Sequence, residues 1–212
     1  MALRDHSLDD KITSAAMEEF LDKGYTGASL RKIAEKAGIT VGAIQTRYRS
    51  KDELFASLLK PFLDDIEATF KSVKADYYSG ADGGLLAQLK VSMRHESAAI
   101  LRLILAHYNE AVLLFYKSAG SSLERYFDMV VQSKIDESAA FFRSMGYTGI
   151  DEKLLGLLIS VQFDSYRRVV LDSPDAESAE DYMNSLMTYH LGGWVALFDS
   201  AGIKEEDAKN EV

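Results

Sequence analysis

Basic, amide and hydroxyl side chains gather near the start of a chain that is otherwise acidic. Residues 1–51 contain nine Lys and Arg against seven Asp and Glu, whereas residues 52–212 contain 15 against 26, so the net charge of −9 hides an asymmetry. The stretch GITVGAIQTRYRSK, residues 38–51, ends in Arg47, Arg49 and Lys51. Cationic groups pair with phosphates, and amide or hydroxyl groups can contact base edges. The residue types in this stretch therefore suit a contact with nucleic acid.

The spacing around this stretch predicts three helices, the second of them short, followed by a fourth. Ser29 is placed to cap a helix over LRKIAEKA that Gly38 ends, and Thr40 is placed to cap the next. Ser50 to Glu53 has the pattern of a capping box that opens a fourth helix. Three helices within about 45 residues, the last two joined by a tight turn, have the form of a helix-turn-helix.

The third of these helices has weak intrinsic helix propensity but a thin front. Val41, Gly42 and Ala43 would let its N-terminus approach a groove closely, while Ile44 and Tyr48, four residues apart, would pack inward against the second helix. The predicted DNA-binding residues are Ser29, Arg31, Thr40, Val41, Gly42, Ala43, Gln45, Thr46, Arg47, Tyr48 and Lys51. The alternative reading is that these are ordinary caps and surface charges of a small three-helix unit.

Residues 12–59, ITSAAMEEFLDKGYTGASLRKIAEKAGITVGAIQTRYRSKDELFASLL, resemble the N-terminal domain of the TetR family of one-component transcriptional regulators. The resemblance implies that Val41 to Arg47 form the recognition helix, that Arg31 contacts base or backbone, and that Lys51 contacts a phosphate. Two positions depart from the family pattern. Val41 stands where Lys or a polar residue is frequent, and Gln45 stands where a phosphate-contacting tyrosine is common, so Val41 is a candidate thymine-methyl contact and Gln45 a candidate adenine reader.

Apolar residues at spacings of three and four, with only two prolines, predict an all-α fold of about nine helices. We expect a helix-turn-helix domain over residues 1–51, a larger helical effector-binding and dimerisation domain over residues 52–202, and a charged tail over residues 203–212. The longer helices are expected at about 52–75, 83–106, 108–117, 122–146, 151–172 and 177–200.

The middle helices carry aromatic and polar residues in an apolar setting, as the wall of a ligand cavity would. The candidate pocket residues are Phe62, Ile66, Phe70, His95, His107, Tyr108, Phe115, Tyr116, Tyr126, Met129, Phe163, Tyr166 and Arg167. The alternative is that this aromatic pattern is ordinary core. Pro61 lies just before this set within a predicted helix and is either a hinge for transmitting ligand occupancy or a simple kink.

The last two predicted helices are apolar on more than one face, which requires two partners. One face can pack within the subunit and the other on a two-fold-related copy, forming a four-helix bundle. The candidate interface residues are Leu158, Gln162, Met183, Leu186, Met187, His190, Gly193, Trp194 and Leu197. The alternative is that both helices are central in a monomer.

Composition and motifs exclude several other classes of protein. The chain has no cysteine, so it has no disulfide or thiolate metal site. No nucleotide-binding, serine-hydrolase or zinc-protease motif occurs, since His95-Glu96 lacks the second histidine of H-E-x-x-H. We therefore expect no enzyme activity, cofactor or metal, and the absence of a signal segment or long apolar run predicts a cytoplasmic protein without membrane contact.

The favoured function is a ligand-responsive regulator, a repressor in the family's usual mode. A homodimer would bind a pseudo-palindromic double-stranded DNA operator and be released by an unknown small molecule. A regulator acting mainly through protein–protein contact is the alternative, motivated by the modest positive balance of the N-terminal part and by Gln45. An all-helical enzyme ranks below both.

Overall fold

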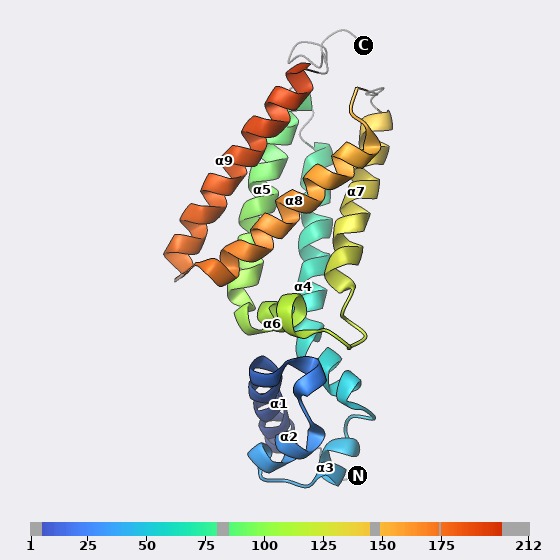
Figure 1. Ribbon diagram of the computed structural model, residues 1–212, viewed down its shortest axis with the longest axis vertical. Coiled ribbons are helices and arrows are strands. Elements are labelled where there is room, and N and C mark those ends of the chain that lie inside the picture. The colour runs from blue at the N-terminus through green and yellow to red at the C-terminus, as the bar shows by residue number, and fades with distance from the viewer. Residues whose placement is uncertain (1–5, 80–84, 145–148, 174, 201–212) are drawn as a thin grey trace. The chain divides into compact units, whose positions relative to one another are not determined.

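The computed structural model describes residues 6–79, 85–144, 149–173 and 175–200, and within them every regular element is helical (Figure 1). These residues form nine α-helices and one π-helical stretch, with no strand among them. The all-α fold class is confirmed. The predicted charged tail lies outside the described residues.

The chain forms two compact units, and each is built from separate segments. The first unit contains Met1–Asp64 and His107–Phe127, and the second contains Asp65–Ala106 and Asp128–Val212. The first unit is therefore larger than the predicted domain of residues 1–51. It includes the beginning of the fourth helix and a segment from the middle of the chain.

In the first unit, α1 (His6–Gly27), α2 (Leu30–Ala37) and α3 (Val41–Gln45) precede the start of α4 (Lys51–Ser79). The middle segment contributes α6 (Tyr108–Val112) and the π-helical η1 (Leu113–Lys117), both of which pack on α1. Phe20 and Phe55 meet edge to face at 4.9 Å between ring centroids. The buried apolar side chains of this unit include Ile12, Ala16, Phe20, Ile33, Ile44, Leu54, Phe55, Leu59, Phe62, Leu113 and Leu114.

The second unit contains α5 (Leu85–Ala106), most of α7 (Tyr126–Ser144), α8 (Glu152–Asp172) and α9 (Ala176–Ser200). α9 packs on α5 and α8, and α8 also contacts α5. Its buried side chains include Met93, Ile100, Leu101, Ile104, Val131, Leu155, Ile159, Phe163, Tyr166, Val169, Met183 and Phe198. A cluster around Phe198 contains Phe141, Phe142, Ile150, Trp194 and Val195.

α7 begins at Tyr126 and not at residue 122 as predicted. The intervening residues form short turns, because Glu124 N–H bonds to Ser121 O and Tyr126 N–H to Leu123 O. The Ser122 N–H donates to the Asp52 carboxylate at 2.8 Å and not to a helical carbonyl. A contact distant in sequence thus delays the helix.

No single helix in the described part of the chain is long and apolar enough to cross a membrane. The segments Val91–Ala106 and Tyr108–Lys117 reach that length and composition only as a bent pair.

Candidate DNA-binding surface

Side-chain caps set where the two helices of the turn begin. Ser29 Oγ accepts a hydrogen bond from Lys32 N at 3.2 Å, and Thr40 Oγ1 accepts one from Ala43 N at 3.2 Å. Gly38, with φ +67°, ends α2 in the left-handed conformation. The predicted caps and the predicted glycine turn are confirmed.

One side of α3 is buried and the other is open. Ile44 is fully buried and holds the helix to the unit, whereas Gly42, Gln45 and Thr46 are exposed. Val41, Ala43 and Tyr48 are half-buried. A Cβ at Gly42 would find only Thr40 Oγ1 at 3.8 Å, so internal packing does not require glycine there. The exposed side of α3 is therefore a thin surface with an amide and a hydroxyl at its centre.

Two of the three basic residues in the predicted DNA-binding set have hydrogen-bond partners within the unit. Lys51 Nζ donates to the carbonyls of Tyr25 at 2.6 Å and Ala28 at 3.0 Å, and it lies 4.4 Å from the centroid of the Tyr25 ring. Arg47 Nε donates to Asp9 Oδ1 at 2.5 Å. Arg31, in contrast, is exposed at the start of α2. Lys51 thus caps the end of α1 with two of its three protons.

The end of α1 is also tied to the segment that follows η1. Thr26 Oγ1 donates to Ala119 O at 2.7 Å, and the Asp52 carboxylate accepts from Ser122 N. Burial alone would raise the pKa of Asp52, but hydrogen bonds from Ser122 and Tyr25 hold it below the ordinary value. Burial, followed by the charge of Asp52, raises the pKa of Tyr25. No motif in the sequence indicated that residues 117–122 belong to this unit.

The predicted pocket residues divide between the two units. Those of the first unit are Phe62, His107, Tyr108, Phe115, Tyr116 and Tyr126, and those of the second are Ile66, Phe70, His95, Met129, Phe163, Tyr166 and Arg167. In the first unit, Phe62 contacts the rings of His107 at 5.4 Å and Phe115 at 6.2 Å between centroids. His95 and Met129 are exposed. An effector pocket formed by the whole set stays a prediction.

A chain of hydrogen bonds crosses the core of the second unit. Trp194 Nε1 can only donate, and it reaches Gln162 Oε1 at 3.0 Å, which orients Gln162 Nε2 toward Tyr166 Oη at 3.0 Å. Ser97 Oγ gives its proton to Met93 O, so the Tyr166 phenol donates to Ser97 Oγ at 3.0 Å. These bonds join α5, α8 and α9, and sequence reasoning had not connected them.

A serine and a histidine also meet in this unit, but not as a nucleophile and base. Ser165 Oγ lies 2.9 Å from His190 Nε2 and donates to Gln162 O at 2.7 Å. Because the hydroxyl has a single proton, the imidazole must donate to the serine oxygen. A histidine that donates cannot remove the serine proton, so this pair provides structure and not hydrolysis.

Sequence reasoning also missed a buried carboxylate on α5. Glu96 is 5% exposed, and its Oε1 lies 2.7 Å from Lys134 Nζ. At this distance the Lys134 ammonium on α7 pairs with the Glu96 carboxylate on α5. In the sequence, Glu96 stands out only as part of an incomplete H-E-x-x-H motif.

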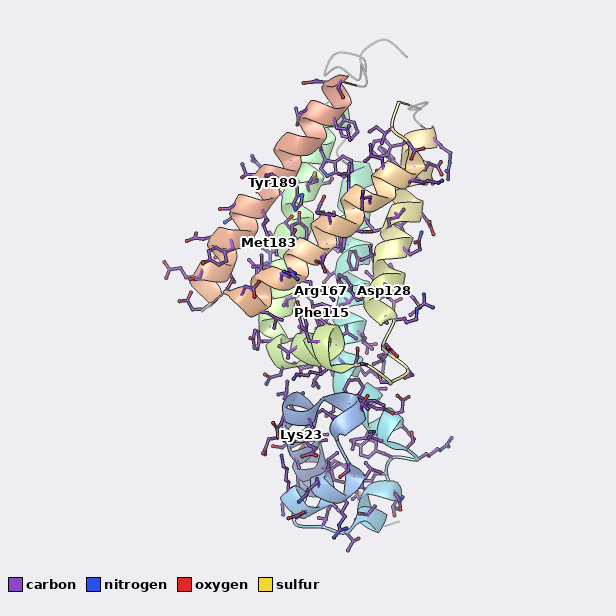
Figure 2. All side chains as sticks on the ribbon, in the orientation of Figure 1. Lys23, Phe115, Asp128, Arg167, Met183 and Tyr189 are labelled. Carbon is purple, nitrogen blue, oxygen red and sulfur yellow. The ribbon has the colours of Figure 1, made fainter. Side chains whose placement is uncertain are left out.

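The predicted dimer residues have unequal access to a second copy. Gln162 and Met183 are buried within the unit at 6% and 2% exposure, so neither can form an interface as predicted (Met183 is labelled in Figure 2). Gly193 is exposed, while Leu158, Leu186, Met187, His190, Trp194 and Leu197 are half-buried. The most exposed apolar side chains of α8 and α9 are instead Leu157, Val161, Tyr182 and Tyr189, at 60%, 52%, 48% and 75% (Tyr189 is labelled in Figure 2).

Comparisons with known proteins agree with this architecture. Residues 12–58 match the family described as bacterial regulatory proteins, tetR family. An HTH-type transcriptional regulator of Staphylococcus aureus is 25% identical over 172 residues, covering 76% of this chain and 89% of the relative. The transcriptional repressor KstR2 of Rhodococcus jostii is 27% identical over 102 residues, covering 48% of each chain. The transcriptional regulator FadR of Bacillus subtilis, solved in complex with stearoyl-CoA, superposes with a TM-score of 0.57 at 19% identity, covering 87% of this chain and 98% of that one.

Proposed function

We propose that this chain, whose residues 12–58 match the tetR family of bacterial regulatory proteins, is a transcriptional regulator that binds a pseudo-palindromic DNA operator as a homodimer and represses transcription from it. The exposed side of α3 carries this proposal. Gly42, Gln45 and Thr46 are open there, beside the buried anchor Ile44 and near exposed Arg31 on α2. A thin helix front with polar groups suits the major groove, and a basic residue at its margin suits phosphate.

Dimerisation is supported by the apolar side chains exposed on two long helices of one unit. Leu157 and Val161 on α8 lie four residues apart, and Tyr182 and Tyr189 on α9 lie seven apart, so each pair occupies one helix face. A second copy would cover these faces, and a helix-turn-helix reading two half-sites needs that copy. Gly192 and Gly193 would allow close approach, because an added Cβ at either position would meet no atom within 4 Å among the described residues beyond its own stretch of helix.

A small-molecule effector is supported by the second unit and by one solved relative. Glu96, which is 5% exposed, places a carboxylate paired with Lys134 in the interior of the second unit, where it would orient a polar group of an effector. Because FadR was solved with stearoyl-CoA, long-chain acyl-CoA esters are the first effectors to test. An effector that prefers the non-binding arrangement by about 1–3 kcal/mol would weaken operator binding roughly 5- to 150-fold. As a DNA-binding regulator, the protein would act in the cytoplasm.

The test is a gel shift on the DNA upstream of the protein's own gene. We expect a complex that resists competitor DNA and weakens steeply with salt, and we expect Gln45→Ala to lower specific binding more than non-specific binding. A panel of acyl-CoA esters and free fatty acids then tests release. If wild-type protein forms no salt-sensitive complex with any duplex, the protein–protein alternative is favoured and the operator proposal fails.

A further inference from the structure

Two arginines at the end of the recognition element lie in different surroundings. Arg47 is 17% exposed in its side chain, and its Nε is 2.5 Å from Oδ1 of Asp9, whose side chain is 19% exposed. Arg47 Nη1 also reaches Ala43 O at 3.5 Å, the limit of a hydrogen bond. The Arg47 guanidinium thus joins the first turns of α1 to the last turn of α3.

Arg49, two residues on, is exposed and forms no ion pair with the part of the chain that the structure describes. Its backbone is nevertheless well held. The Arg49 N–H donates to Glu53 Oε2 at 2.7 Å, and Glu53 N–H donates to Ser50 Oγ at 3.0 Å. These two bonds close the capping box of α4, so the Arg49 side chain extends from a fixed point beside α3.

The cost of contacting a phosphate differs between these two residues. To contact a phosphate, Arg47 would have to give up its ion pair with Asp9. The Asp9 carboxylate would then be largely buried without Arg47 and would lie next to DNA, which has the same charge. Arg49 loses no ion pair, so its contact with a phosphate keeps the full gain from counterion release.

We propose that Arg47 is a positioning residue that Asp9 holds to orient α3, and that Arg49 is the basic residue contacting phosphate at this end of the recognition element. The proposal rests on the proposed DNA-binding function. It reassigns Arg47 from the predicted set of DNA contacts and adds Arg49, which that set did not contain.

The experiment measures how the affinity for a mixed-sequence duplex of about three helical turns depends on salt. Arg49→Ala should lower the slope of log K against log salt by about 1.8, from two phosphates per homodimer at about 0.9 each. Between 50 and 200 mM salt, this variant would lose about 12-fold less affinity than the wild type. Arg49→Ala should melt at the wild-type temperature, since its side chain forms no ion pair with the described residues.

Arg47→Ala and Asp9→Ala should each lower the melting temperature, and the exchanged pair Asp9→Arg/Arg47→Asp should regain most of the loss while keeping the wild-type salt slope. If Arg47→Ala does not fold, the exchanged pair still tests whether Arg47 contacts a phosphate. The exchanged pair removes the cation from position 47 while it retains the ion pair. A slope reduced by about 1.8 in the exchanged pair, or unchanged in Arg49→Ala, would overturn the proposal while leaving DNA binding intact. If the wild type shows no salt-dependent binding, the proposed function itself is wrong.

Discussion

Removing the hydroxyl of Tyr166 should destabilise the protein without changing its shape. The phenol is 2% exposed, accepts from Gln162 Nε2 and donates to Ser97 Oγ. In Tyr166→Phe, Gln162 Nε2 keeps its position because Trp194 still holds the other end of the amide, so a buried N–H loses its acceptor. Such a group costs about 1–3 kcal/mol. Ser97 keeps its bond to Met93 O, so we expect a total near the middle of that range.

The assay is thermal unfolding followed by circular dichroism, with Tyr108→Phe as the matched control. A loss of about 2 kcal/mol should lower the melting temperature by about 4–8 °C in a chain of this length, whereas 45%-exposed Tyr108 should tolerate the same change within 1 °C or so. The reasoning is refuted if the two variants melt together.

The same phenol predicts a dependence on alkaline pH. Burial, reinforced by the charge of Glu96, raises the pKa of Tyr166 above the ordinary value of 10.0, although the hydrogen bond that Gln162 donates to the phenol acts in the opposite direction. Because the unfolded chain then loses the phenol proton first, stability should fall as the pH rises above about 10. Tyr166→Phe should lack this part of the decline.

Three further predictions concern other parts of the chain. Gly120→Ala should destabilise by about 1–2 kcal/mol in urea unfolding, because φ is +85° and the new Cβ would lie 3.0 Å from Thr26 Oγ1; an unchanged midpoint would contradict this. Burial lowers the pKa of His190, so the unfolded imidazole takes up a proton before the folded one does, and the free energy of unfolding should decline as the pH falls below about 6.5. His190→Gln should remove the part of this decline that His190 causes, as measured in acid titrations. Leu157→Glu, at a 60%-exposed position, should produce monomers in sedimentation while leaving helix content intact; a stable dimer would exclude this face.

Local signals in the sequence predicted the helix-turn-helix well. Ser29, Gly38 and Thr40 act on residues within four positions of themselves, so their effects are readable from spacing alone. The same holds for the inward face of α3 at Ile44. Residue type did not predict which basic side chains can contact DNA without losing an internal hydrogen bond, because Arg47 and Lys51 donate to residues 38 and 26 positions away.

The helical periodicity of α8 and α9 indicated that both are apolar on several sides but not which side faces inward. Gln162 looked like an interface residue, yet its amide fits a hydrogen-bonded chain with Trp194 and Tyr166 that only tertiary packing creates. The side chains of Leu157 and Val161, one helical turn apart, are the ones exposed to solvent. The polarity of a side chain therefore cannot show whether a helix face is buried or exposed when the interior supplies hydrogen-bond partners for that side chain.

The middle segment has a consequence for protein engineering. Because His107–Phe127 belongs to the first unit while the helices on both sides of it belong to the second, the polypeptide passes between the units three times. A chimera that transfers only the first 64 residues onto a foreign effector domain would leave behind two hydrogen-bond partners: the carbonyl of Ala119, to which Thr26 donates, and the amide of Ser122, which donates to Asp52. A portable DNA-binding module from this protein must therefore be assembled from two separate pieces of chain.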